Sequence, residues 1–115
     1  LGNIVAVKGN CLEEETYPEE LKECQSLIHS VGTLFQGNKS YNTYAAMNTD
    51  TCVKIATKFN EYAKASGKQR NFVMISSEKA PPFLNEYVTS KRIAEDFLLN
   101  ECEHLRVHIL RPGFI

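Results

Sequence analysis

Tyr87 and Lys91 are the two residues whose types and spacing could do chemistry together. Four positions make about one helical turn, so a helix here places the phenol and the ammonium on one face, where both can reach one reacting atom. A nearby ammonium lowers the pKa of a tyrosine from about 10 toward working pH by favouring phenolate. The pair is therefore suited to moving a proton during hydride transfer, with the tyrosine as acid and base. The same spacing also arises by chance, as a half-buried tyrosine beside a solvated lysine.

The residues before this pair predict how it is positioned. The apolar run 72–75 is typical of a short buried strand, which stops at Ser76 and Ser77. Pro81 and Pro82 then predict an open loop, because proline fixes φ and lacks an amide proton, and a helix follows. Successive strand side chains alternate between faces, so only one of the two serines can point toward a substrate beside the pair. We favour Ser77, and Ser76 is the alternative.

Strands and helices alternate along the rest of the chain. Apolar runs predict strands over residues 4–7, 26–32 and 105–110. Apolar residues at a period of three and four predict a long helix over 44–65, ended by the Ser-Gly pair that follows, and a shorter helix is expected over 18–24. This order of elements argues for a parallel α/β sheet with helical crossovers.

Two further expectations concern side chains near the pair. The predicted packing stripe of its helix contains Ala94, Leu98 and Cys102, with Ile93 and Phe97 beside it. Glu95 and Asp96 are expected on the solvent side of that helix. His29 lies in a strand, where a histidine is more often simply hydrogen-bonded than catalytic.

Composition describes an ordinary globular domain. The chain has 115 residues, 43% of them hydrophobic, and a net charge of −1. This size permits one domain, and the charge balance does not indicate a basic surface that would bind nucleic acid. No apolar run approaches the roughly 20 residues of a membrane span. The four cysteines include no C-x-x-C and form no metal-like cluster with the three histidines, so we expect reduced thiols and no metal site.

Five short segments carry a resemblance to a known family. HSVGT, MNTDT, MISSEK, YVTSK and ILRPGFI occur in that order over most of the chain. Together they resemble the central part of a short-chain dehydrogenase/reductase of the extended or atypical kind. Among members of that family, the chain resembles mitochondrial NAD(P)-binding proteins associated with coenzyme Q biosynthesis. An accessory subunit of respiratory complex I is a second relative.

The resemblance implies roles for four catalytic residues. Tyr87 would be the general acid and base, and Lys91 would lower its pKa and hold the nicotinamide ribose. Ser77 would steady the substrate oxygen. Asn48 would support a water-linked proton relay beside the pair, although a surface position on its helix is an equal alternative from the sequence.

The resemblance also implies a site for a dinucleotide, NAD or NADP. Its expected residues are Asn10 and Cys11 near the adenine, Ser30, Val31 and Gly32 near ribose and phosphates, and Lys91, Pro112 and Gly113 near the nicotinamide. Asn10 is just as readily a turn residue that stabilises its own loop. The sequence holds no G-x-x-G-x-x-G, the family's pyrophosphate-binding motif, and it lacks the residues that select NAD or NADP.

These observations predict part of a Rossmann-like doubly wound parallel sheet, with the third to sixth strands present and the first two strands and the Gly-rich loop missing. Residues 1–115 would form a single partial NAD(P)-binding domain, an internal fragment that is inactive alone. The sequence begins at a leucine and shows neither a methionine nor a targeting peptide at that point, from which we expect an internal piece of a longer protein.

Two functions follow from the resemblance. The first is an NAD(P)-dependent oxidoreductase that acts in mitochondrial coenzyme Q biosynthesis on an unidentified small molecule. The second is a non-catalytic nucleotide-binding subunit or assembly factor of a mitochondrial multiprotein complex. Retention of both Tyr87 and Lys91 favours catalysis, because a fold kept only for binding has less need of the pair.

Overall fold

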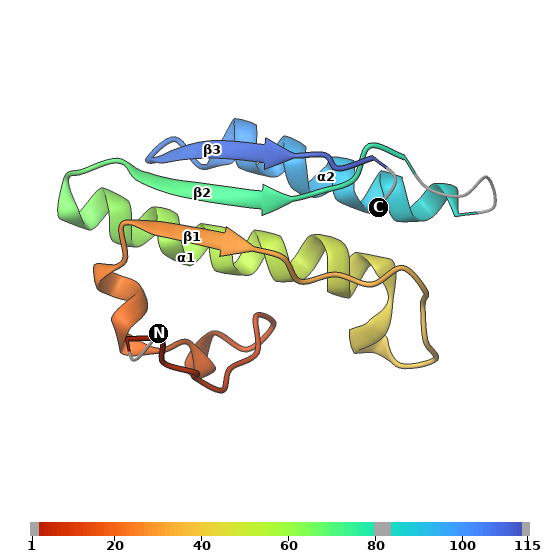
Figure 1. Ribbon diagram of the computed structural model, residues 1–115, viewed down its shortest axis with the longest axis horizontal. Helices are drawn as coiled ribbons and strands as arrows, with labels where there is room; N and C mark the ends of the chain where they lie inside the picture. Colours follow the sequence, from red (N-terminus) through yellow and green to blue (C-terminus); the bar gives the residue numbers. More distant parts are fainter. Residues whose placement is uncertain (1–2, 80–83, 114–115) are drawn as a thin grey trace.

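The computed structural model describes residues 3–79 and 84–113 (Figure 1). Three strands and two long helices form the fold: β1 (Ser26–His29), α1 (Thr51–Ser66), β2 (Arg70–Ile75), α2 (Asn85–Glu101) and β3 (Leu105–Leu110). Four short helical turns lie before α1: the 3-10 helices η1 (Glu14–Thr16), η2 (Glu19–Glu23) and η3 (Ser40–Asn42), and the π-helix η4 (Ala45–Asp50). The predicted strand–helix order from β1 onward is confirmed.

The strands form one parallel sheet in the order β1-β2-β3. The chain is therefore an α/β protein with a partial Rossmann-like fold, as predicted. Because all three strands run in one direction, their carboxyl ends meet at one edge of the sheet, where α2 begins (Figure 1).

Both long helices cover the same face of the sheet (Figure 1). Along β2 the residues Phe72 and Met74 are fully buried on that face and belong to the core that the helices complete. On the opposite face Ile28 and Leu110 are 69% and 52% exposed. Because a strand's side chains alternate between faces, one face of the sheet packs against the helices and the other face is exposed.

The apolar residues that recur every three or four positions in the sequence form the helical part of the core. The predicted stripe of α1 is buried, namely Cys52, Ala56, Phe59 and Ala63. Gly67 ends this helix with φ of 71°, the left-handed geometry that glycine adopts without strain. The stripe of α2 is buried too, at Ala94, Leu98 and Cys102.

Two expectations for α2 are wrong. Ile93 is 53% exposed and stands outside the packing face. Glu95 is only 1% exposed, although the sequence placed it on the solvent side. It lies one helical turn after Lys91, on the face that meets the strand ends, and partners there compensate its charge.

The expected strand over residues 4–7 is also wrong. This segment forms no strand, and Ile4, Val5 and Val7 are more than half exposed. An extended segment gains ladder hydrogen bonds only beside another strand, and no described strand lies next to it. The short helix expected over 18–24 is present as η2, whereas Pro81 and Pro82 lie outside the described residues. No helix in the described ranges is long and apolar enough to span a bilayer.

His29 is a structural residue of the core, as expected. It is 3% exposed, its ring stacks on Phe72 with centroids 6.2 Å apart, and its Nε2 lies 3.5 Å from Thr51 Oγ1. Burial, with a smaller contribution from the charge of Lys91, lowers the pKa of His29 to about 4. The imidazole is therefore neutral in the folded protein at neutral pH.

We predict that this histidine makes the protein acid-sensitive. Between pH 6.5 and about 4, the His29 imidazole is protonated in the unfolded chain but stays neutral in the folded chain. The free energy of unfolding is therefore highest above pH 6.5 and decreases as the pH falls. A shift from 6.5 to about 4 corresponds to roughly 3 kcal/mol. Urea unfolding at several pH values should show this slope in the wild type and in the exposed-site control His108→Gln. In His29→Gln the slope near pH 6.5 should disappear, while the slope at lower pH, where Glu95 also contributes, should remain. An unchanged slope near pH 6.5 would contradict the assignment.

Candidate functional site

The carboxyl ends of β1 and β2 and the first turns of α2 line a small, open cavity of about 220 Å³. Its lining residues are Ser30, Gly32, Thr33, Leu34, Ile75, Ser76, Tyr87 and Lys91. Tyr87 and Lys91 therefore lie in one cavity, on one face of α2, beside two of the residues expected at the dinucleotide.

Lys91 is a buried cation. Its side chain is 4% exposed, and its Nζ donates to the carbonyl of Ile75 over 3.4 Å. Burial lowers the pKa of Lys91, and interactions with Cys52 and with the carboxylate of Glu95 oppose this shift. An ammonium in such surroundings acts strongly on any neighbouring phenol, because less water screens it.

Tyr87 is half-buried and faces the cavity lined by Lys91. Its ring meets the edge of Tyr44, with centroids 6.1 Å apart, and the Tyr44 hydroxyl is held by the carbonyl of Leu34 over 2.7 Å. Among the described residues the Tyr87 hydroxyl has no hydrogen-bond partner. It is thus available to a ligand in the cavity.

Asn48 is fully buried, so the surface alternative is wrong. Its Oδ1 accepts from the Thr33 amide at 2.7 Å, and its Nδ2 donates to the Thr33 carbonyl and to Ser90 Oγ, each at 3.1 Å. It lies in the π-helix η4, and such turns commonly redirect side chains at functional sites. Both amide protons are engaged, so Asn48 ties the exit of β1 to α2. Its part in a proton relay stays a prediction.

Gly32 lets these groups approach one another. A Cβ at this position would lie 2.8 Å from Asn48 Oδ1 and 2.9 Å from Lys91 Nζ. Both distances are shorter than real Cβ contacts. A residue larger than glycine would therefore force Asn48 and Lys91 to shift.

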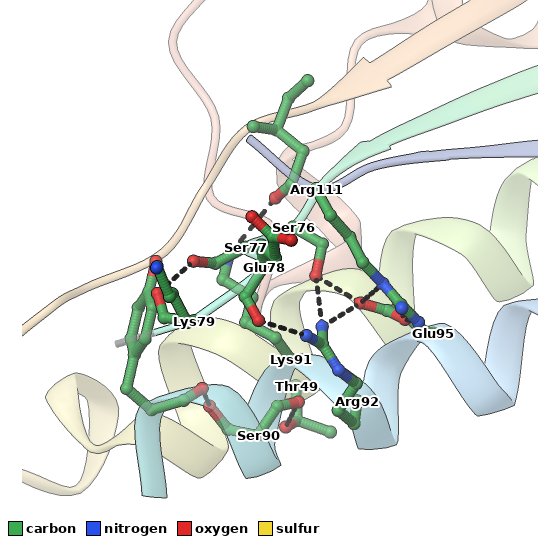
Figure 2. Close-up of polar contacts among 12 residues, drawn as sticks. Thr49, Ser76, Ser77, Glu78, Lys79, Ser90, Lys91, Arg92, Glu95 and Arg111 are labelled. Atoms are coloured by element: carbon green, nitrogen blue, oxygen red, sulfur yellow. Dashed lines mark hydrogen bonds and ion pairs between the residues drawn. The ribbon is translucent and has the colours of Figure 1, made fainter. Parts of the chain in front are cut away.

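The two serines after β2 differ in their surroundings. Ser76 lines the cavity, yet its hydroxyl donates to Glu95. Ser77 is outside the lining residues, and its hydroxyl donates to the carbonyl of Lys79 over 2.9 Å (Figure 2). Each hydroxyl donates to a group other than Tyr87, so the choice of substrate-facing serine stays a prediction.

A second, larger cleft of about 600 Å³ lies between the N-terminal segment and the start of α1. Its lining residues are Lys8, Gly9, Asn10, Cys11, Glu13, Thr16, Val31, Met47 and Thr51. Three residues expected at the dinucleotide thus lie together here, while Ser30 and Gly32 line the smaller cavity. The residues that follow β1 run between the cleft and the smaller cavity, and they line the two in alternation because successive side chains point in opposite directions. Asn10 Oδ1 also accepts from the Leu12 amide at 2.9 Å, so its turn role is real as well.

The Pro112–Gly113 turn lies against the exit of β2. The Pro112 carbonyl accepts from the Glu78 amide over 3.1 Å, and a Cβ at Gly113 would come within 2.9 Å of Glu78 Oε2. Neither residue is among those lining the two cavities. Phe114 and Ile115, the end of the family-like segment, lie outside the described residues.

Glu95 is the residue that sequence reasoning missed (Figure 2). Its carboxylate accepts from Arg92, Arg111 and Ser76. Burial raises its pKa, but the hydrogen bonds and charges of these partners outweigh burial and hold the pKa below its usual value. Its spacing from Lys91 could have predicted the burial of Glu95, because a residue four positions after Lys91 shares the inward face of the helix.

Comparison with known proteins gives two matches. The model of the NAD-binding family described as male sterility protein matches residues 49–115, more than half of the chain. MIOREX complex component 2 of Saccharomyces cerevisiae is 30% identical over 129 aligned positions, which cover 98% of this chain and 47% of that protein. The chain thus spans about half the length of this curated relative. The family match includes Tyr87 and Lys91 but begins after Asn48.

The close approach at Gly32 gives a prediction. Gly32→Ala should lower the free energy of unfolding by about 1–3 kcal/mol, because buried Asn48 must move to admit the methyl group. Gly113→Ala is the matched control, since its methyl group meets only the end of the exposed Glu78 side chain. Urea unfolding of both variants measures the difference. Equal stability of the two would refute the packing argument.

Proposed function

This chain belongs to the NAD-binding family described as male sterility protein, and from that premise we propose that it is an NAD(P)-dependent oxidoreductase domain of the short-chain dehydrogenase/reductase type. The observation that carries this proposal is the shared cavity of Tyr87 and Lys91 at the carboxyl edge of a parallel sheet. In open α/β sheets ligands bind at this edge.

Each residue of the cavity would have its own role in hydride transfer. Tyr87 passes a proton to or from the substrate oxygen, and the bound dinucleotide supplies or accepts the hydride. Lys91, desolvated and 4% exposed, favours the phenolate and holds the nicotinamide ribose. Ser77, or Ser76 in its place, steadies the substrate oxygen. Asn48 keeps the exit of β1 in register with α2.

The two cavities suit the two halves of a dinucleotide. The cleft with Asn10, Cys11 and Val31 would take the adenosine, and the cavity with Lys91 would take the nicotinamide. Ser30 and Gly32 then pass close to the bridge between the halves, and the Pro112–Gly113 turn would back the nicotinamide. The 115 residues contain no G-x-x-G-x-x-G, so the pyrophosphate contacts would come from sequence outside them.

The resemblance described above points to mitochondria and to coenzyme Q biosynthesis, with a small-molecule substrate. A second candidate function is that of a non-catalytic nucleotide-binding subunit of a mitochondrial multiprotein complex. The observation in its favour is the similarity to a protein named as a component of the MIOREX complex. The presence of Tyr87 and a buried lysine in one cavity favours catalysis over this second function.

The proposed roles predict a separation of binding from chemistry. In the full-length protein Tyr87→Phe should abolish hydride transfer and leave the Kd for NADH or NADPH within about threefold, which is less than 1 kcal/mol. Lys91→Ala should weaken both, because it removes the ribose contact and the charge. Tyr41→Phe, at a tyrosine that is 55% exposed, is the matched control. Calorimetry and absorbance of the reduced nicotinamide give the two readouts. Full activity of Tyr87→Phe would favour the non-catalytic subunit.

The missing pyrophosphate motif predicts that the 115 residues alone bind poorly. Loss of several charge-assisted hydrogen bonds, at about 1.5–3 kcal/mol each, would weaken binding by several powers of ten. Calorimetric titration with NADH and NADPH should show no micromolar binding by residues 1–115. A protein extended upstream should bind. Micromolar affinity of the short chain would overturn the proposed division of the dinucleotide site.

A further inference from the structure

Glu95 is a buried charge held by three segments of the chain. Its side chain is 2% exposed, and both carboxylate oxygens are engaged. Arg92 comes from the same helix, Ser76 from the end of β2, and Arg111 from the residue after β3 (Figure 2). One carboxylate thus joins the helix that carries Tyr87 and Lys91 to the exits of two neighbouring strands.

The contacts form a closed network. Arg92 Nη1 donates to Glu95 Oε2 at 2.6 Å, and Arg92 Nη2 donates to the Glu78 carbonyl at 3.0 Å. Arg111 Nε donates to Oε1 at 3.1 Å and to Oε2 at 3.3 Å, and its Nη2 also reaches Oε1. Ser76 completes the set by donating to Oε2 and lies 3.4 Å from Arg92 Nη1.

A network of this kind resists displacement. A buried carboxylate is tolerated only with partners, and moving α2 along or around its axis would separate Glu95 from at least one guanidinium. Lys91 lies one turn before Glu95 and Tyr87 one turn before Lys91, so all three move together as parts of one helix. The carboxylate of Glu95 also acts on Lys91, because its negative charge opposes the lowering of the Lys91 pKa by burial. The Cys52 thiol of α1 and the His29 imidazole of β1 interact with Lys91 as well, and burial keeps both of them neutral at neutral pH.

We propose that Glu95 is a positioning residue, which holds the Tyr87–Lys91 pair at a fixed place relative to the strand exits through Ser76 and Arg111. This inference rests on the proposed oxidoreductase function for its kinetic consequences. It also assigns Ser76 to the network, because a hydroxyl has one proton and that of Ser76 is directed to Glu95. Of the two serines in the proposed function, this inference therefore favours Ser77 at the substrate oxygen, because Ser76 cannot donate there while the network is intact.

The test compares Glu95→Gln with Asp96→Asn in the full-length protein. Asp96 is the next residue on the helix and is exposed, so its variant removes the same charge outside the network. Glu95→Gln should lower kcat for hydride transfer by about tenfold to a hundredfold, the cost of a slight misplacement of catalytic groups. It should also lower the NMR titration midpoint of the Lys91 ammonium, because an attracting charge is lost. Asp96→Asn should change neither value.

Further variants keep the outcome decisive. Adding Ser76→Ala to Glu95→Gln should cause no further loss of kcat, since both act in one network, whereas a multiplied loss would overturn the assignment of Ser76. If Glu95→Gln does not fold, Arg111→Gln replaces it, because it leaves the carboxylate charged and removes only the link to β3. A wild-type kcat in that variant, or in folded Glu95→Gln, would overturn the positioning role.

The Lys91 titration separates this inference from the proposed function. It needs no turnover, so a protein without hydride transfer can still be tested. A lowered midpoint in Glu95→Gln without any wild-type activity would refute the oxidoreductase function alone and support the coupling of Glu95 to Lys91. An unchanged midpoint would overturn that coupling whatever the activity.

Discussion

Parallel pairing of β2 with β1 on one side and β3 on the other is the constraint on which the site depends. It brings the ends of three strands, which are far apart in sequence, to one edge of the sheet. The first turns of α2 begin at that edge, so Tyr87 and Lys91 meet the exit of β1 there. Antiparallel pairing would have sent alternate strand ends to opposite edges and divided these groups.

The edge is then fixed by polar contacts rather than by apolar packing. Asn48 joins the exit of β1 to α2 through Thr33 and Ser90, and Glu95 joins α2 to the exits of β2 and β3. Hydrogen bonds have directions, whereas apolar contacts tolerate small shifts, so these two side chains define position more sharply than the core can. The apolar core supplies the stability, and the polar contacts supply the geometry.

Burial of Lys91 fits the proposed chemistry. Desolvation lowers the pKa of the ammonium, while the negative charge of Glu95 opposes that shift and helps to keep the cation in place. A neutral lysine could not favour phenolate on Tyr87.

The sequence by itself determined the elements from β1 onward, the parallel α/β class and the one-turn spacing of Tyr87 and Lys91, because apolar period and helical pitch are local properties. Only the tertiary structure decided the rest. Residues 4–7 have a strand's composition, but no strand of the described residues lies beside them, and local pattern cannot reveal that. Glu95 looked like a solvent residue because its compensating partners, Ser76 and Arg111, lie 19 and 16 positions away. Burial of a charge depends on such distant partners, and no local pattern contains them.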